Sequence, residues 1–260
     1  MPYATLTVES DDSLAVLTLN RPEKRNAIST PMTNEFAAAL AEIAAGPARV
    51  MILTGAGKAF CAGMDLEGLR ELVHQPPERN YEDSRRMASL FHRLYSFPKP
   101  TIAAVNGHAL AGGCGLATLC DFTLAVPSAK FGYTEARIGF VPALVSVFLT
   151  RQIGEKQARD LLLTARLVSA EEAAGMGLVN EVVEPERLIA RARELAQTLA
   201  ANSPESLLAT KRLLLDFGEA KVERQLALAV DANARIRQTE DFREGISSFL
   251  EKRQPRWSGK

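Results

Sequence analysis

Apolar and polar residues alternate twice near the start of the chain, a pattern typical of β-strands. Residues 3–8 and 14–19 alternate with a period of two, and polar residues 10–13 separate them. This arrangement predicts a β-hairpin. Three continuous apolar runs follow, at residues 50–53, 101–105 and 122–126. Continuous runs are typical of strands covered on both faces, so they predict a buried parallel sheet.

Helical spacing appears between these strands. Thr30 and Pro31 are typical of an N-cap followed by proline at the first helical position. The apolar positions that follow at helical spacing, before Gly46, are Phe36, Leu40 and Ile43. A second apolar helical face runs through residues 81–95. Because strands and helices alternate, the pattern predicts an α/β layered core.

From residue 185 onward the chain reads as helical. Three helices are predicted here. Ser203 and Pro204 are typical of the start of the second helix. The apolar stripes of the first and third helices are formed by Leu188, Ala192, Leu195 and Leu199, and by Val222, Leu226, Val230 and Ile236. No internal repeat or Pro/Gly-rich linker separates this part from the core. We therefore expect an α/β core over residues 1–195 and a C-terminal helical region over residues 196–260 that packs on it.

The composition and charge of the chain exclude several classes of protein. The 260 residues are 47% apolar and carry 31 Lys+Arg against 31 Asp+Glu, which argues against disorder and against a nucleic-acid partner. Cys61, Cys114 and Cys120 show no metal-ligand spacing, so we expect reduced thiols and no metal site. The sequence shows no signal peptide and no apolar run long enough to span a membrane. We expect a cytoplasmic protein without a membrane partner.

Two glycine-bearing turns are candidates for chemistry. One spans residues 61–66 after the strand at 50–53, and the other spans residues 109–113 after the strand at 101–105. The first amides of a helix lack intrahelical partners and point outward, so each turn can bind developing negative charge. If the N–H groups of Met64 and Gly112 converge, they form a two-donor oxyanion hole. The alternative is that these glycines only permit tight turns and close packing.

Glu135 is the candidate proton-transfer residue. It lies in an aromatic and apolar stretch, residues 131–139, after the third core strand. Burial there favours the protonated carboxyl group and raises its pKa into the range of a useful base. The alternatives are an ion pair with Arg137 and an ordinary exposed carboxylate.

These segments, in this order, resemble the crotonase, or enoyl-CoA hydratase/isomerase, family over essentially the whole chain. The stretches that carry the resemblance are residues 20–27, 58–66, 100–121 and 131–142. The resemblance implies a spiral of ββα units with a C-terminal helical trimerisation region that also packs on neighbouring subunits. It implies an acyl-CoA substrate and a homotrimer or a homohexamer, a dimer of trimers. Coenzyme A then belongs to the substrate, and no separate cofactor is expected.

The resemblance also assigns roles to residues. Met64 and Gly112 match the family's oxyanion-hole positions. The residues that match positions holding the coenzyme A nucleotide and pantetheine are Arg25, Ala27, Ala62, Gly63, Asp65 and Leu66. Lys24 is a further candidate partner for phosphate; the alternative for Lys24 and Arg25 is a role as solvated loop cations.

The chain departs from the family's hydratases at one catalytic position. Those hydratases carry two catalytic glutamates; Glu135 matches the second, whereas Gly115 occupies the place of the first. Losing one carboxylate weakens water positioning more than enolate formation, so the departure favours double-bond isomerisation over hydration. Ala143 replaces the aspartate of the family's dienoyl-CoA isomerases, which argues against that two-base reaction.

Both reactions and one non-catalytic role stay open from the sequence. Other groups that could support hydration by reaching the pocket are Tyr133, Glu67, Glu71 and Asp83. We expect an enoyl-CoA hydratase/isomerase in which Glu135 moves the proton. The alternative is a catalytically weak acyl-CoA-binding or scaffold member of the same fold.

Overall fold

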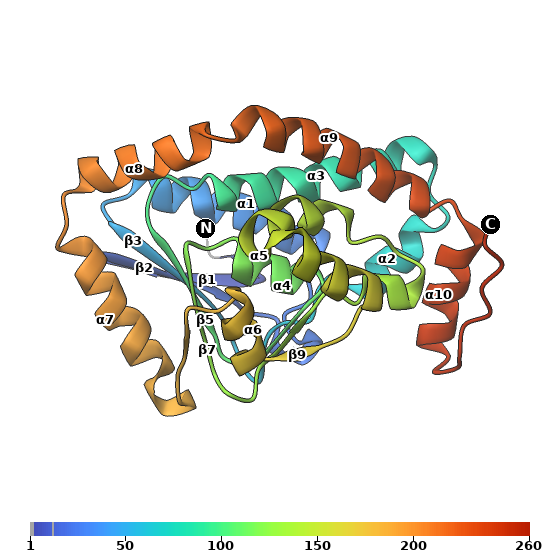
Figure 1. The fold of residues 1–260 in the computed structure, drawn as a ribbon, viewed down its shortest axis with the longest axis horizontal. Coiled ribbons are helices and arrows are strands. Elements are labelled where there is room, and N and C mark those ends of the chain that lie inside the picture. Colours follow the sequence, from blue (N-terminus) through green and yellow to red (C-terminus); the bar gives the residue numbers. More distant parts are fainter. Residues whose placement is uncertain (1–2, 12) are drawn as a thin grey trace.

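The computed structural model describes residues 3–11 and 13–260, and two sheets form its centre (Figure 1). The larger sheet has the order β1-β2-β3-β5-β7-β10. Its strands are β1 (Leu6–Ser10), β2 (Leu14–Leu19), β3 (Val50–Gly55), β5 (Thr101–Val105), β7 (Phe122–Ala125) and β10 (Glu181–Val182). β1 and β2 pair antiparallel, and every other pair in this sheet is parallel. The predicted hairpin and the predicted parallel core strands are confirmed.

A smaller sheet was not predicted. Its order is β4-β6-β8-β9, with β4 (Ala59–Cys61), β6 (His108–Leu110), β8 (Lys130–Gly132) and β9 (Val168–Ser169). Strands of two or three residues are too short to show a hydrophobic period, so the sequence gives no signal for them. Each long strand is followed by a short strand and then by helix: β3 by β4, β5 by β6, and β7 by β8. The chain therefore winds as successive ββα turns.

Helices cover the sheets and extend the molecule beyond them (Figure 1). They are α1 (Thr30–Ala45), α2 (Leu66–Leu72), α3 (Pro77–Tyr95), α4 (Gly112–Thr118), α5 (Ala143–Thr164), α6 (Ala170–Met176), α7 (Leu188–Ala200), α8 (Pro204–Asp216), α9 (Glu219–Ile236) and α10 (Glu240–Leu250). The 3₁₀ helices are η1 (Pro22–Lys24), η2 (Glu135–Ile138) and η3 (Pro185–Arg187). None of the helices in the described part is long and apolar enough to cross a membrane.

The first helix begins one residue earlier than its sequence suggests. Ser29, not Thr30, is the N-cap of α1: its backbone is extended and its hydroxyl accepts the N–H of Met32. Both residue types cap well, so composition alone does not distinguish them. The later cap at Ser203 is confirmed, because its hydroxyl accepts the N–H of Ser206 at the start of α8.

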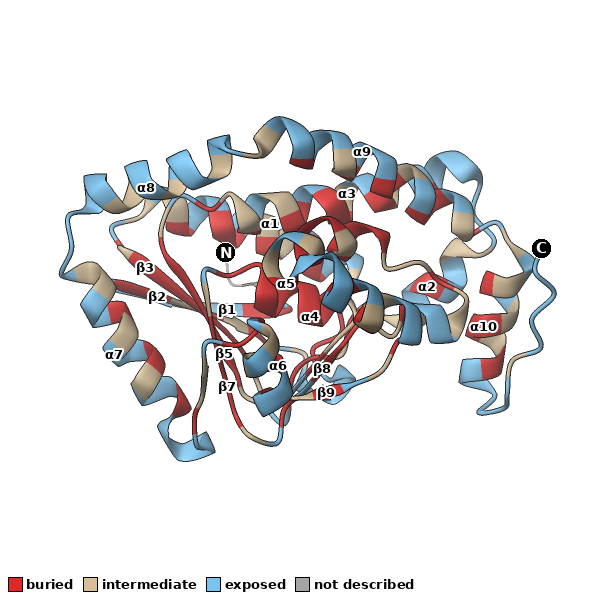
Figure 2. Cartoon of the chain, in the orientation of Figure 1, coloured by how far each residue is buried: buried red, intermediate tan, exposed pale blue. Residues whose placement is uncertain are grey.

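The C-terminal helices attach to the core in different ways. α7 packs on β3, β5 and β7, whereas α9 packs on α3 and α5. The expected division at residues 195 and 196 lies within α7. α8 has no buried residue and follows one edge of the molecule together with α9, as the exposed surface in Figure 2 shows.

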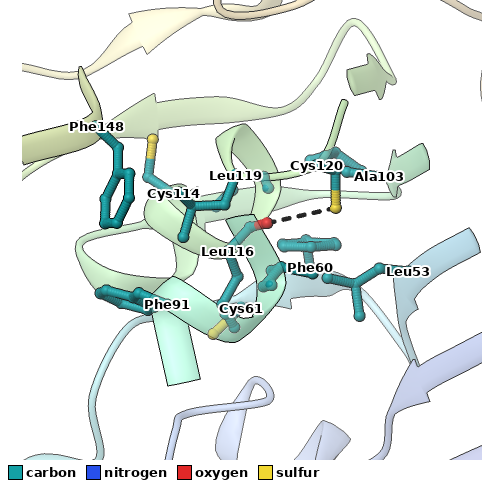
Figure 3. Close-up of a cluster of buried hydrophobic side chains, with 14 of the residues drawn as sticks. Leu53, Phe60, Cys61, Phe91, Ala103, Cys114, Leu116, Leu119, Cys120 and Phe148 are labelled. Carbon is teal, nitrogen blue, oxygen red and sulfur yellow. Dashed lines mark hydrogen bonds between the residues drawn. The ribbon is translucent and has the colours of Figure 1, made fainter. Parts of the chain in front are cut away.

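Figure 3 shows a cluster of buried hydrophobic side chains around α4. Cys61, Cys114 and Cys120 are free thiols buried in this cluster, and the Cys120 Sγ lies 3.7 Å from the Leu116 carbonyl oxygen. Burial raises the pKa of each of the three thiols to about 12. They therefore behave as apolar packing groups and not as nucleophiles.

Gly113 allows α4 to touch β4. A Cβ atom at residue 113 would lie 2.4 Å from the Cys61 carbonyl oxygen and 2.8 Å from its sulfur. We predict that Gly113→Ala lowers the free energy of unfolding by about 1–3 kcal/mol, because the backbone must move to admit a methyl group. The matched control is Gly175→Ala in α6, where a Cβ meets nothing within 4 Å. It should raise stability by up to about 1 kcal/mol. Urea unfolding of both variants measures the contrast, and equal effects would contradict it.

Candidate functional site

A mainly apolar cavity lies where both glycine-bearing turns, η2 and α3 meet. It has a volume of about 590 Å³, which suits a small-molecule ligand. Predicted site residues that line it are Arg25, Ala27, Ala62, Met64, Asp65, Leu66, Gly112 and Glu135. Gly63 does not line the cavity; its carbonyl oxygen accepts the Ile28 N–H behind the wall. The remaining walls are mainly apolar and include Met87, Phe91, Phe140, Leu144 and Val145.

The two turns touch each other at the cavity wall. A Cβ atom on Gly63 would lie 2.9 Å from the Ala111 Cβ and 3.7 Å from the Gly112 nitrogen. Pairing of β4 with β6, through Cys61 and Ala109, brings the turns together. Gly63 also has a φ of +93°, which favours glycine. The backbones of Met64 and Gly112 are therefore neighbours, as the oxyanion-hole hypothesis requires.

Neither amide has a hydrogen-bond acceptor among the described residues. Ile28 pairs with the segment around Met64 through the Gly63 carbonyl and the Asp65 N–H, so the Met64 N–H points away from Ile28. Gly112 is the first residue of α4, and such an N–H lacks an intrahelical acceptor. Both residues line the cavity.

Backbone strain orients the second donor. Ala111 has φ 50° and ψ −127°, a conformation that glycine usually adopts at the start of a type II′ turn. Its N–H donates to the Gly132 carbonyl at 2.7 Å, which ties the turn to β8. Strain of this kind costs about 1–3 kcal/mol and is common at functional sites.

Glu135 is buried and its carboxyl group is short of partners. The residue is 8% exposed, and its Oε2 has no hydrogen bond within the described residues. Burial raises the pKa of Glu135 to about 7. No ion pair with Arg137 forms among the described residues, and Arg137 is exposed. Glu135 is therefore buried and forms no ion pair with Arg137, whereas its role as a base stays a prediction.

The C-terminal helix supports Glu135 from behind. η2 begins at Glu135 and ends at Gly139, whose φ is +66°. A Cβ on Gly139 would lie 2.3 Å from the Asp241 carbonyl, and one on Gly245 would lie 2.2 Å from Ile138. These glycines let α10 lie directly on η2, and Phe249 and Leu250 of α10 line the cavity. The sequence analysis did not identify this support.

Apolar groups lie against Gly115, the position that the family resemblance assigns to the first glutamate of the hydratases. A Cβ on Gly115 would lie 2.7 Å from the Val145 Cγ1 and 3.5 Å from the Phe91 ring. A side chain at residue 115 would therefore require Val145 to move.

The other acids suggested from the sequence do not replace it. The Tyr133 hydroxyl is buried behind the wall, 3.3 Å from the Thr118 hydroxyl. Glu67 lines the cavity but is exposed and pairs with Lys24 at 3.0 Å. Glu71 and Asp83 line a neighbouring cavity instead. Among the described lining residues, Glu135 is the buried carboxylate without a cationic partner.

Two residues that fix the entrance loop were missed. Asn26 is fully buried in the left-handed conformation, and its amide donates to the carbonyls of Ala56 and Ala59. Arg21 donates to the Ala27 carbonyl and pairs with Asp65 at 3.0 Å. The Asp65 carboxylate also caps α2, so it positions the loop from inside the wall. The sequence of residues 20–27 indicated this loop through the family resemblance, but it did not predict these contacts.

The raised pKa makes Glu135 costly to the fold at high pH. A carboxyl group ordinarily titrates near pH 4.5 and this one near 7, so the folded chain holds its proton longer and stability falls between those values as pH rises. We predict that Glu135→Gln is more stable than wild type by about 3 kcal/mol above pH 7, and that this advantage disappears below about pH 4.5. Thermal or urea unfolding at several pH values measures it. The exposed Glu9→Gln is the control, and an advantage independent of pH would contradict the prediction.

The chain is similar to known proteins over nearly its whole length. The sequence model of the family described as "Enoyl-CoA hydratase/isomerase" matches residues 9–260. A Thermus thermophilus protein assigned as an enoyl-CoA hydratase is 49% identical, over 94% of this chain and 97% of that protein. The crotonyl-CoA hydratase of Syntrophomonas wolfei is 34% identical, with complete coverage of both chains.

Solved structures give the same picture. An enoyl-CoA hydratase/isomerase from Xanthobacter autotrophicus Py2 superimposes with a TM-score of 0.89 at 32% identity, over 96% of this chain and 97% of that chain. An enoyl-CoA hydratase from Bacillus halodurans also reaches 0.89, at 25% identity, over 94% of this chain and 100% of that chain. The ββα winding is therefore shared with these structures.

Proposed function

Because the chain belongs to the enoyl-CoA hydratase/isomerase family, we propose that it acts on acyl-CoA thioesters through an enolate, with Glu135 as the proton-transfer residue. The single observation that carries the proposal is a buried, unpartnered carboxyl group in the cavity that two unused backbone amides also face. The Met64 and Gly112 N–H groups would receive the thioester oxygen, and each donor of this kind is worth about 3–4 kcal/mol in a transition state. We propose no metal or redox cofactor, because coenzyme A is part of the substrate.

The geometry favours moving a double bond from the 3-position to the 2-position. The Glu135 carboxylate would take a proton from the carbon next to the thioester carbonyl, and the two amides would hold the resulting dienolate oxygen. Glu135 would then return the proton to the fourth carbon, so one base serves both steps. Val145 and Phe91 close the space beside Gly115 where a second acid would hold a water molecule.

Hydration of a 2-enoyl-CoA is the second candidate. It is supported by the names of relatives, which are hydratases. In this reaction Glu135 would activate a water molecule alone and give its proton to the substrate. A third candidate is a scaffold member that binds acyl-CoA and turns it over weakly.

The loop at Arg25 would hold the nucleotide end of coenzyme A. Arg25 and Lys24 line the cavity entrance, and Ala27, Ala62 and Leu66 provide small or apolar wall beside them. Cations suit phosphate groups, and narrow apolar walls suit the pantetheine arm. Asp65 would form part of this wall, and Gly63 would shape it from behind.

We predict that Glu135→Gln lowers kcat by about 10²–10⁴-fold, because general acid–base catalysis contributes that much. In wild type, kcat/KM should rise with pH through about 7, because the carboxylate is the active form. Assays with a 3-enoyl-CoA and with crotonyl-CoA measure both, and Glu67→Gln, at the exposed rim, is the control. Unchanged activity in Glu135→Gln would remove Glu135 from the mechanism. Tight binding without turnover of any enoyl-CoA would favour the scaffold role.

We also propose a homotrimer or homohexamer assembled through the C-terminal helices. Three large apolar side chains are exposed at the end of α8 and are here called the α8 patch. They are Leu213 (54% exposed), Leu214 (60%) and the C-cap residue Phe217 (73%). Contiguous exposed apolar groups of this kind mark interaction surfaces. Covering them with a second copy is consistent with the oligomers that the family resemblance implies.

We predict that Leu214→Glu combined with Phe217→Glu reduces the particle mass towards that of one 28.2 kDa chain, because a charge at each position opposes burial. Light scattering coupled to gel filtration measures the mass. The control is Leu163→Glu on α5, which is 77% exposed but lies outside the α8 patch. A wild-type protein that is already a monomer would contradict the assembly.

A further inference from the structure

A buried polar cluster borders the otherwise apolar acyl cavity. Asn233 of α9 lines the cavity and is 4% exposed. Its Oδ1 accepts the Ser84 hydroxyl at 2.7 Å and the Arg237 Nη2 at 2.9 Å. Neither Ser84 nor Arg237 lines the cavity, so Asn233 is the member of this cluster that a ligand can reach.

The contacts fix which way the Asn233 amide faces. A guanidinium group has donors and no acceptor, so the atom facing Arg237 is the carboxamide oxygen. Every hydrogen bond of the Asn233 side chain within the described residues goes to Oδ1. The Nδ2 group, with two N–H donors, is left without a partner at the cavity wall.

The charge of the cluster is compensated. Arg237 is 1% exposed, its Nη1 pairs with Asp83 at 2.8 Å, and its guanidinium lies 5.4 Å from the centre of the Phe140 ring. Because a carboxylate already faces this cation, the cluster offers a ligand a neutral donor and no free positive charge.

The cluster lies away from the two oxyanion amides along α3. The Phe91 ring is next to Gly112 and Gly115, and Ser84 lies seven residues earlier on the same face as Met87 and Phe91. At a rise of about 1.5 Å per residue, seven residues span roughly 10 Å. A ligand whose thioester lies at Gly112 therefore reaches Asn233 with the distal part of its acyl chain.

We propose that Asn233 is a specificity-determining residue that selects acyl chains with a neutral acceptor oxygen, such as a ketone, in their distal half. The inference rests on the proposed acyl-CoA function and adds the class of acyl group. A site that presents an unpaired donor at an apolar cavity wall discriminates against chains that leave it unpaired. The apolar wall around it, with Met87, Phe91 and Leu144, takes the rest of the chain.

The test uses pairs of acyl-CoA thioesters of equal chain length. One member of each pair has a plain alkyl chain, and the other carries a ketone in the distal half of the chain. The ketone is moved by one carbon from pair to pair. Binding of saturated pairs is measured by calorimetry, and kcat/KM is measured with the matching enoyl-CoA pairs. Wild type should favour one ketone position by about 10-fold, which is about 1.4 kcal/mol. Asn233→Asp keeps an oxygen for Ser84 and Arg237 but loses the donor, so it should favour the alkyl chain instead. Asn20→Asp, at an exposed asparagine away from the cavity, is the control and should keep the wild-type preference.

The outcomes separate this inference from the proposed function. Normal turnover without a ketone preference at any position, or a preference that Asn233→Asp retains, overturns the inference. If an acyl-CoA with a distal carboxylate binds more strongly than the ketone, the proposed selection for a neutral acceptor is wrong. A ketone preference in binding that Asn233→Asp reverses supports the inference even if no enoyl-CoA is turned over, a result that would overturn the proposed function alone.

Discussion

The close contact between two backbone turns is the constraint on which the rest of this structure depends. β4 and β6 pair only where no side chain intervenes, and Gly63 and Gly113 supply the space. At this contact the Met64 and Gly112 amides have no acceptor among the described residues, and both residues line the cavity. Fixed donors need no reorganisation when charge develops on a ligand, which is the physical basis of an oxyanion hole.

Two groups at the cavity lower the stability of the fold. Glu135 loses solvation and gains no cationic partner, and Ala111 adopts a backbone conformation suited to glycine. Such costs persist where the surroundings impose them. Here α10 holds η2 from one side, while β8 holds the Ala111 turn from the other. The large buried core behind α4 supplies the stability that offsets these local costs.

Local patterns in the sequence predicted the elements but not the contacts between them. The hairpin and the helices at α1, α3, α7 and α9 repeat their period, the long core strands are continuous apolar runs, and α8 begins with a Ser-Pro start signal. The short strands of the second sheet carry no period, and α10 gave no expectation. The order of motifs indicated Met64, Gly112 and Glu135, yet η2, which begins at Glu135, packs on α10, more than a hundred residues later. The pairing of Gly115 with Val145 is likewise a contact between separate helices, so one sequence does not reveal it.

The dependence of η2 on α10 also has a consequence for biosynthesis. Domains form progressively from the N-terminus as the chain emerges from the ribosome. The strands of both sheets are complete only once β10 has been made, and α10, which packs on η2, follows later still. A nascent chain can therefore hold both sheets while η2 still lacks the helix that packs on it.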